Sequence, residues 1–451
     1  MIFLATALIL ASTLLLMFMA VVGLLRRRLS SVVFFATAGY AFVAAANAED
    51  LIGQFGEDTY FQMSLIYVIA SIVLSISVQF FSEFVPRLRL SLPVWNQHDF
   101  QWHATLATVL ALASATLIIF SRGGNLFLNW ADARESNDFL TALATLLFML
   151  ASPGIISAFY AKRRALGVIL LLLCLGLFVV IGSRASLLGA LIFGMWLMLV
   201  RAKGVGSRLR VVVIALVLTF AIHTFLRSLR GFGIGGLLKA FDEGNLLAAL
   251  LSPQDDVDVS GGEAHVPDHF MFSITQSSID NFGFMTSIQR LILLPLPSVK
   301  EWITKPMDVT AILWNKAFES GLLNDAQGQA LLLESYITGK AGSLHPTFFG
   351  EYFLAGGWIA LVLSIVVLGA VFVAIDFFMH RADRLTALAL CGPVLIGYLF
   401  VARGSSVAGF GFIVYLGVMV GLLRYFVKCV RRLCVAATTN NSSSPETTRH
   451  A

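Results

Sequence analysis

Several arginine residues stand where long apolar segments begin or end. Arg184 interrupts the run FVVIGSRASLLGALIF, and Arg403 closes another apolar segment in VARGSS. Arg227 and Arg230 follow a third segment in FLRSLRGFG. A guanidinium group presents a planar fork of donors that matches phosphate oxygens, and it stays charged at any relevant pH. Together with Arg290 in SIQRLILLPLP, these residues are therefore candidates for an anion-binding site.

A structural role is the alternative for each of these arginines. A long cationic side chain at the end of an apolar helix can extend toward water, or it can pair with a nearby carboxylate such as Glu351. For one arginine alone this explanation is sufficient. Arginines at three such junctions favour a shared function instead.

A second group of reactive side chains lies in AGSLHPTFFGEYFLAGGWIA, residues 341–360. Pro346 is suited to the start of a helix, and the helix dipole favours Glu351 in the first turns. Under this interpretation the residues are structural. In the alternative, His345 or Glu351 contacts a sugar hydroxyl or a pyrophosphate and acts as a general base or as an orienting group. The sequence leaves both alternatives open.

No metal or cofactor is expected from the remaining motifs. DVDVSGG at 256–262 has the opening of a calcium loop, but Pro267 stands where the loop requires glutamate. The four cysteines have no zinc-like spacing. His223 precedes Arg227 by four residues and is more typical of a structural hydrogen-bonding group.

The elements that must position these residues are membrane helices. The chain has 451 residues, of which 58% are hydrophobic and 13% charged, and its mean hydropathy is +0.85. Only helices and closed barrels satisfy their backbone in lipid, and apolar runs this long and uniform are not barrel strands. The sequence predicts an all-α polytopic membrane protein with about eleven transmembrane helices, at about 3–24, 31–47, 60–82, 104–120, 138–160, 166–182, 186–200, 211–226, 348–377, 385–402 and 408–426.

The basic clusters orient these helices. With eleven spans, the clusters near 26–28, 87–89, 162–164, 201–210, 381–384 and 424–432 all fall on one side, and the positive-inside rule makes that side the cytoplasm. The same rule explains the net charge of +5 without an anionic partner. The N-terminus is then periplasmic, the C-terminus is cytoplasmic, and the candidate arginines face outward.

This topology divides the chain into four parts. Residues 1–226 form transmembrane helices one to eight, and 227–347 form a large periplasmic loop. Apolar spacings of three and four residues in that loop predict a partly helical subdomain that packs on the membrane surface. Residues 348–426 form helices nine to eleven, and the polar composition of 427–451 predicts a disordered cytoplasmic tail.

The sequence resembles the Wzy-type polymerases of bacterial O-antigen and related polysaccharides. Three stretches carry the resemblance: IGSRASLLGALIF, HPTFFGEYFLAGGW and VARGSSVAGFGFIVYLG. The segment between FLRSLRGFG and LLPLPS is similar to the large periplasmic loop of these enzymes. In order and layout, the resemblance covers about 165–426.

This resemblance implies a GT-C-like glycosyltransferase of the bacterial inner membrane. Such an enzyme polymerises undecaprenyl-pyrophosphate-linked oligosaccharide repeats at the periplasmic face, with inversion and without a metal or other cofactor, and the lipid pyrophosphate leaves. Its partners would be the lipid-linked substrates, the bilayer and a Wzz-type chain-length regulator, and no nucleic acid.

The candidate residues take roles in this implied reaction. Arg184, Arg227, Arg230 and Arg403 would bind pyrophosphate, with Arg290 as a further candidate. Arg403 would also act in catalysis, while His345 and Glu351 would orient the acceptor or act as base. Two other functions remain possible: an O-antigen ligase or other lipid-linked-glycan transferase, and a transporter of lipid-linked oligosaccharide. The lack of paired broken helices argues against a transporter.

Overall fold

The computed structural model describes most of the apolar segments and a small part of the long loop. The described residues are 1–84, 94–122, 139–181, 184–204, 206–208, 210–211, 214, 242–244, 266–277, 313, 345–404 and 406–441.

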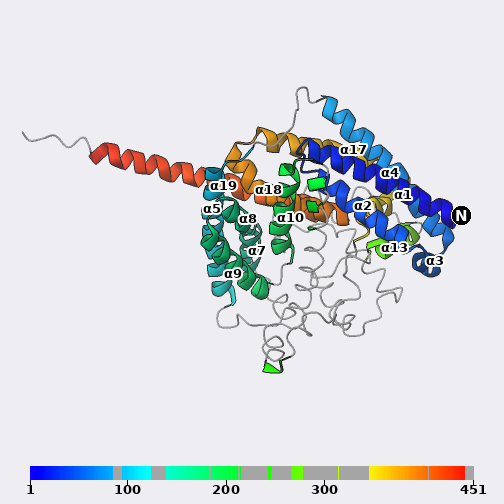
Figure 1. Cartoon of the computed structure of the whole chain (residues 1–451), viewed down its shortest axis with the longest axis horizontal. Coiled ribbons are helices and arrows are strands. Elements are labelled where there is room, and N and C mark those ends of the chain that lie inside the picture. Colours follow the sequence, from blue (N-terminus) through cyan, green and yellow to red (C-terminus); the bar gives the residue numbers. More distant parts are fainter. Residues whose placement is uncertain are drawn as a thin grey trace, which may run out of the picture.

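Helices make up nearly all of the described residues, which contain no strand. Figure 1 shows how the helices are arranged. Their bounds are α1 Ile2–Leu25, α2 Ser31–Ala46, α3 Ala48–Phe55, α4 Glu57–Phe84, α5 Gln97–Arg122, α7 Phe139–Ala151, α8 Gly154–Tyr160, α9 Arg164–Ile181, α10 Arg184–Arg201, α13 Val266–Ser277, α17 Thr347–Arg381, α18 Arg384–Arg403 and α19 Ser406–Asn441.

Many of these helices can cross a membrane. Six segments are long and apolar enough: Ile2–Leu25, Glu57–Phe84, Gln97–Ser121, Leu143–Tyr160, Thr347–Arg381 and Arg384–Arg403. The pair α2 and α3, bent by 74°, qualifies as a seventh. Shorter apolar helices cover Arg164–Phe178, Gly189–Arg201 and Gly409–Leu423.

The prediction of an all-α protein with membrane-spanning helices is therefore confirmed. Each predicted span except the eighth coincides with one of these apolar helices. The eighth, 211–226, lies almost wholly outside the described residues. The total of eleven and the GT-C-like arrangement stay predictions.

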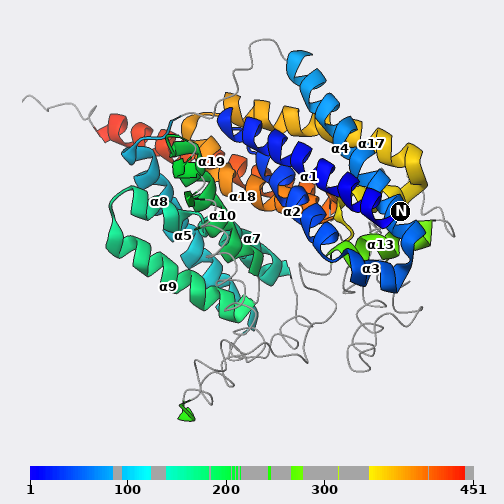
Figure 2. The ribbon, with the colours of Figure 1, turned by 45° about the vertical axis from the view of Figure 1, so that its right-hand side comes forward.

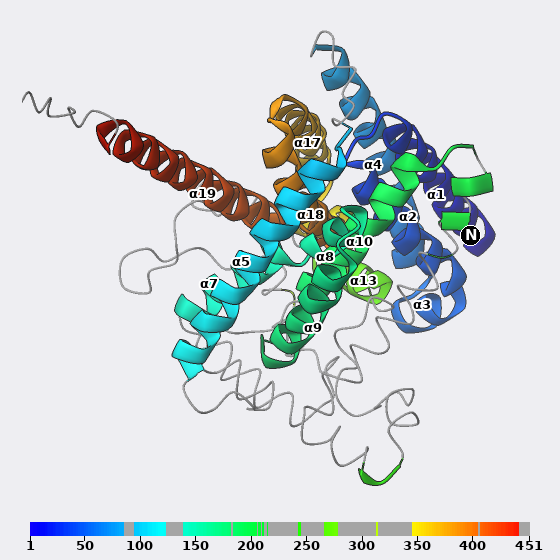
Figure 3. The same cartoon turned by 60° about the vertical axis from the view of Figure 1, so that its left-hand side comes forward.

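The helices form two neighbouring groups that share α18. Figure 2 shows α1, α2, α4 and α17 running together, with α5, α7, α8, α9 and α10 beside them. Large apolar side chains such as Phe3, Leu14 and Ile359 are exposed on the outer helices, as expected where lipid replaces water. Of the six long spans, α18 is the most buried. Figure 3 shows it between the two groups.

α17 is broken near its beginning. Gly356 and Gly357 leave helical dihedrals, with φ and ψ of 175° and 32° and of 64° and −150°. The first part, Thr347–Ala355, is consequently a separate short helical segment, and most of its side chains are buried. The sequence predicted a span over 348–377 but not this break.

The described part of the long loop includes one helix, α13, in a region where apolar spacing predicts one. α13 packs mainly on the first part of α17 and also on α4. The Phe270 ring lies 5.1 Å from the Tyr67 ring and the Phe349 ring lies 5.8 Å from it, both edge-on. This aromatic cluster joins α13, α4 and α17.

α19 extends further than the sequence indicated. Its helix ends at Asn441, whereas the predicted tail begins at 427. Residues 427–441 are therefore helical rather than disordered. A helix that has already formed gains one backbone hydrogen bond with each added residue and needs no new nucleus, so it can continue into a polar segment.

The ends of α1, α4 and α17 that carry or adjoin basic clusters lie together. Arg28 Nη1 donates to Ser82 Oγ near the end of α4 at 3.1 Å. The turn between α1 and α2 donates to Asp376 near the end of α17, through Leu29 N at 3.0 Å and Ser30 Oγ at 2.5 Å. These hydrogen bonds, of which the two to Asp376 are buried, hold three helix ends together.

The basic ends of α10 and α18 belong to the same region. Trp95, just before α5, donates from Nε1 to the Arg384 carbonyl oxygen at 3.1 Å. The Arg201 guanidinium lies 4.4 Å from the centre of the Tyr160 ring. Arg27 lines the same pocket as Trp95 and Arg201, so the two sets of helix ends adjoin.

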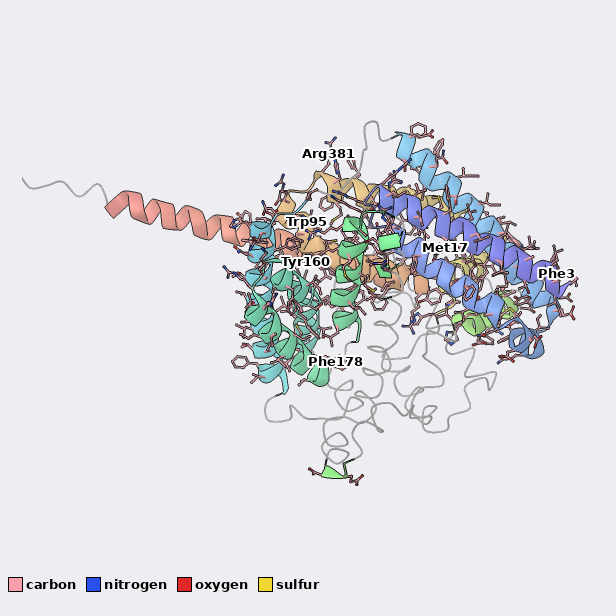
Figure 4. All side chains as sticks on the ribbon, viewed as in Figure 1. Phe3, Met17, Trp95, Tyr160, Phe178 and Arg381 are labelled. Atoms are coloured by element: carbon pink, nitrogen blue, oxygen red, sulfur yellow. The ribbon has the colours of Figure 1, made fainter. Side chains whose placement is uncertain are left out.

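This region, which we call the basic end, is visible in Figure 4. Trp95, Tyr160 and Arg381 lie near the middle of the view, far from Phe3 at the right. The arrangement agrees with the predicted placement of these basic clusters on one side. Which side of the membrane the basic end faces stays a prediction.

Candidate functional site

The beginning of α17 and the end of α18 meet at Gly404. Gly404 ends α18 in a left-handed conformation, with φ 100° and ψ 37°. A Cβ atom here would lie 2.6 Å from the Thr347 carbonyl oxygen and 2.8 Å from Thr347 N. Both the dihedral angles and the close approach therefore require glycine. The contact brings Arg403 beside the residues that precede α17.

Thr347 has an unusual backbone conformation at this junction. Its φ is 60°, although it is β-branched and fully buried. A β-branched residue at positive φ is an outlier that persists only where the surrounding packing holds it. Its side chain lies near the buried Tyr67 hydroxyl of α4. The strained backbone is therefore clamped between α4 and Gly404.

Glu351 connects α17 to the beginning of α19. Its Oε2 atom accepts hydrogen bonds from Ser406 N at 3.0 Å and from Ser406 Oγ at 2.7 Å. The side chain is buried. A carboxylate at a helix N-terminus satisfies a backbone donor that has no partner within the helix, and the helix dipole favours its charge. Glu351 thus caps α19, whereas the structural role expected from the sequence was an interaction with the dipole of its own helix.

His345 is held by a second histidine. His345 N donates to His269 Nδ1 at 3.3 Å, which joins the residue before Pro346 to α13. Both imidazoles are buried. Gly350 lies against α13 as well, since a Cβ atom there would be 2.6 Å from Phe270. α13 therefore forms one wall of the site.

The surroundings of His345 keep its imidazole neutral. Burial lowers its pKa well below the usual value, and the positive charge of Arg403 and the nearby His269 lower that pKa further. Hydrogen bonding with the Gly404 backbone opposes this shift without reversing it. A neutral imidazole at pH 7 can accept a proton from a hydroxyl group.

Arg403 lies at the end of α18 that is remote from the basic end. Arg384 begins the same helix, and twenty residues of helix span about 30 Å. Arg403 is half-buried, whereas Arg384 is exposed. Arg403 and the exposed Arg384 therefore lie at opposite ends of α18.

The structure brings together the three residues that were predicted to take part in catalysis. His345, Glu351 and Arg403 are joined through Gly404, Thr347 and Ser406, and Pro346 stands just before the helix as predicted.

The structure does not describe the side chains of the other predicted arginines. Arg184 begins α10, but its side chain lies outside the described residues. Arg227, Arg230 and Arg290 also lie outside them.

Sequence reasoning missed His269, Thr347 and Ser406. Ser406 carried a usable signal, since it stands two residues after Gly404, where glycine ends one helix and polar residues favour the start of another. His269 gave none, because its partner His345 is distant in sequence. Among the described residues, no group of three or more His, Cys, Asp or Glu side chains could hold a metal ion.

Comparison with known proteins gave no relative. No protein-family model matches the chain, and no curated protein or solved structure matches it significantly.

Proposed function

We propose that this protein is a glycosyltransferase that polymerises lipid-pyrophosphate-linked oligosaccharide repeats at the outer face of a bacterial inner membrane. The observation that supports it best is the meeting of Arg403, His345 and Glu351 at helix ends far from the basic end. A half-buried guanidinium beside a neutral imidazole offers an anion site next to a proton acceptor. The eleven spans and the GT-C-like arrangement are part of the proposal.

The proposed chemistry needs both groups. An acceptor hydroxyl oxygen forms a bond to the anomeric carbon of the donor sugar, while the bond from that carbon to the pyrophosphate oxygen breaks. The pyrophosphate leaves with the bonding electrons, and the hydroxyl proton passes to the His345 imidazole. Arg403 stabilises the charge that develops on the leaving pyrophosphate, and preorganised donors are most effective at such a position.

Glu351 has a positioning role in this scheme. Its Oε2 atom already accepts two hydrogen bonds from Ser406, so it fixes the turn that carries Arg403 and Gly404. Arg184, Arg227, Arg230 and Arg290 complete the pyrophosphate site, from the start of α10 and from the loop. The lipid-linked repeats are the substrates, and a chain-length regulator of the Wzz type is a proposed partner.

Incubation of the purified full-length protein with undecaprenyl-pyrophosphate-linked repeats tests the proposal. A ladder of products of increasing length is expected, with and without a chelator, because guanidinium groups supply the positive charge. A single transfer to lipid A–core would identify a ligase instead. Absence of any glycosyl transfer, in conditions where the protein remains folded, would exclude the proposal.

A further inference from the structure

The basic end contains a pocket that the proposed reaction does not use. Its volume is about 330 Å³, part of which is open to solvent. It is formed by the turn after α1, the segment before α5 and the last part of α10. The lining residues are Arg27, Val94, Trp95, Trp196, Leu197, Val200 and Arg201.

The charge of this pocket is positive. Arg27 and Arg201 line it from two different elements, and the set of described lining residues includes no acidic side chain. The Arg201 guanidinium lies over two rings, 4.4 Å from the centre of Tyr160 and 5.1 Å from that of Phe100. This stacking holds the cation in place while its edge remains available for hydrogen bonding.

The rest of the lining is apolar and aromatic. Leu197 and Val200 provide an aliphatic wall, and the Trp95 and Trp196 rings lie 6.3 Å apart. Trp95 Nε1 already donates to a backbone carbonyl oxygen. The buried Trp196 Nε1 has no hydrogen-bond partner among the described residues.

We propose that this pocket binds the phosphate headgroup of an anionic phospholipid from the leaflet at the basic end. Two guanidinium groups match a phosphate diester, and tryptophan and aliphatic side chains match the glycerol and upper acyl region. If the basic end faces the cytoplasm, the adjoining leaflet is the one whose anionic lipids attract basic residues. The inference rests on the predicted orientation of the protein, with the basic end at the cytoplasmic leaflet, and it does not depend on glycosyl transfer.

The bound lipid would fasten elements that are distant in sequence. Arg27 follows α1, Trp95 precedes α5, and α10 carries both Trp196 and Arg201. α10 begins at Arg184, at its opposite end. A headgroup between these elements would therefore fix α10, and with it the position of Arg184.

Native mass spectrometry of the full-length protein tests the proposal. The protein is released from nanodiscs of equal parts phosphatidylglycerol and phosphatidylcholine, and the retained lipid is identified. We expect retained phosphatidylglycerol in the wild-type protein and an at least roughly tenfold lower ratio of bound to free lipid in Arg201→Gln. Arg27→Gln is the second variant, because it leaves the stacked Arg201 intact.

Arg381→Gln is the matched control. Arg381 ends α17 at the same basic end and lies over Phe377 at 4.8 Å, but it does not line the pocket. This variant should retain phosphatidylglycerol as the wild-type protein does. Equal retention in all four proteins would overturn the proposal, as would equal thermal stabilisation by inorganic phosphate and by phosphatidylglycerol. Loss of glycosyl transfer would test only the proposed function, because lipid retention is measured without substrate.

Discussion

The two ends of the helix bundle both contain arginine and a buried carboxylate, but they use them differently. At the basic end, Asp376 accepts hydrogen bonds from Leu29 and Ser30 in the turn after α1, and Arg28 donates to Ser82. That carboxylate connects two helix ends through hydrogen bonds. At the other end, Glu351 also connects two helix ends, but there Arg403 and His345 lie close to the connection.

The difference separates the arginine for which we propose a function from the arginines that cluster at one end. Several arginines at the basic end are exposed or stacked on aromatic rings. Arg403 lies at the opposite end, is half-buried, and acts electrostatically on a buried histidine. Position along the membrane and neighbouring groups are therefore more informative than residue type.

The largest expected effect comes from His345. His345→Gln removes the proton acceptor, and we expect glycosyl transfer to fall about 10²–10⁴-fold. His269→Gln, which changes only the group behind His345, should reduce transfer less. Rates of product-ladder formation measure both. Similar losses in the two variants would show that the histidine pair is structural.

Arg403 and Arg384 provide a matched comparison along one helix. Arg403→Ala should lower transfer about 10²–10³-fold, because a donor to the developing charge is lost. Arg384→Ala at the basic end should leave the rate nearly unchanged, since the backbone oxygen that Trp95 contacts is retained. Activity per amount of protein in the membrane is the measurement. Equal transfer rates in Arg403→Ala and Arg384→Ala would show that Arg403 has no special role in the reaction.

Replacing Asp376 and replacing Glu351 should lower the unfolding free energy by different amounts. Asp376→Ala leaves the buried Leu29 and Ser30 donors without their acceptor and removes the negative charge near the buried Arg28, and we expect a loss of about 3–5 kcal/mol in unfolding free energy. Glu351→Ala should cost about 1–3 kcal/mol, because Ser406 loses its acceptor. Glu351→Gln keeps an acceptor oxygen and should keep most of the stability. Thermal unfolding in detergent distinguishes these variants, and full transfer activity in Glu351→Gln would support the positioning role.

The smallest effect concerns pH. Folding lowers the pKa of His345 below its unfolded value of about 6.5, so the unfolded chain binds a proton more readily. Stability from this group is present above about pH 6.5 and is lost as pH falls toward the folded pKa. The wild-type protein should therefore lose more stability than His345→Gln between about pH 6.5 and 5. Parallel pH profiles would indicate that folding leaves the pKa of His345 near its unfolded value.

The apolar helices and the charge pattern could be read from the sequence. Lipid cannot satisfy a backbone that is not hydrogen-bonded internally, so every long apolar run must be helical wherever it packs. The positions of the basic clusters in the sequence predict that they share one side of the helix bundle. In the structure, contacts of Arg28, Trp95 and Arg201 connect helix ends next to these clusters. Arg403 therefore stood out before any coordinates were known.

Tertiary structure decided which polar groups meet. The bonds from Ser406 to Glu351 and from His345 to His269 join residues 55 and 76 positions apart, and hydropathy contains no information on such pairs. The break at Gly356 and Gly357, the strained Thr347 and the pocket at Arg201 likewise depend on how helices pack. The sequence by itself determined that this chain contains long apolar helices with arginine at some of their ends. The reason is that the solvation of each segment depends on that segment alone. Only packing between segments decided that Arg403 lies beside a neutral histidine.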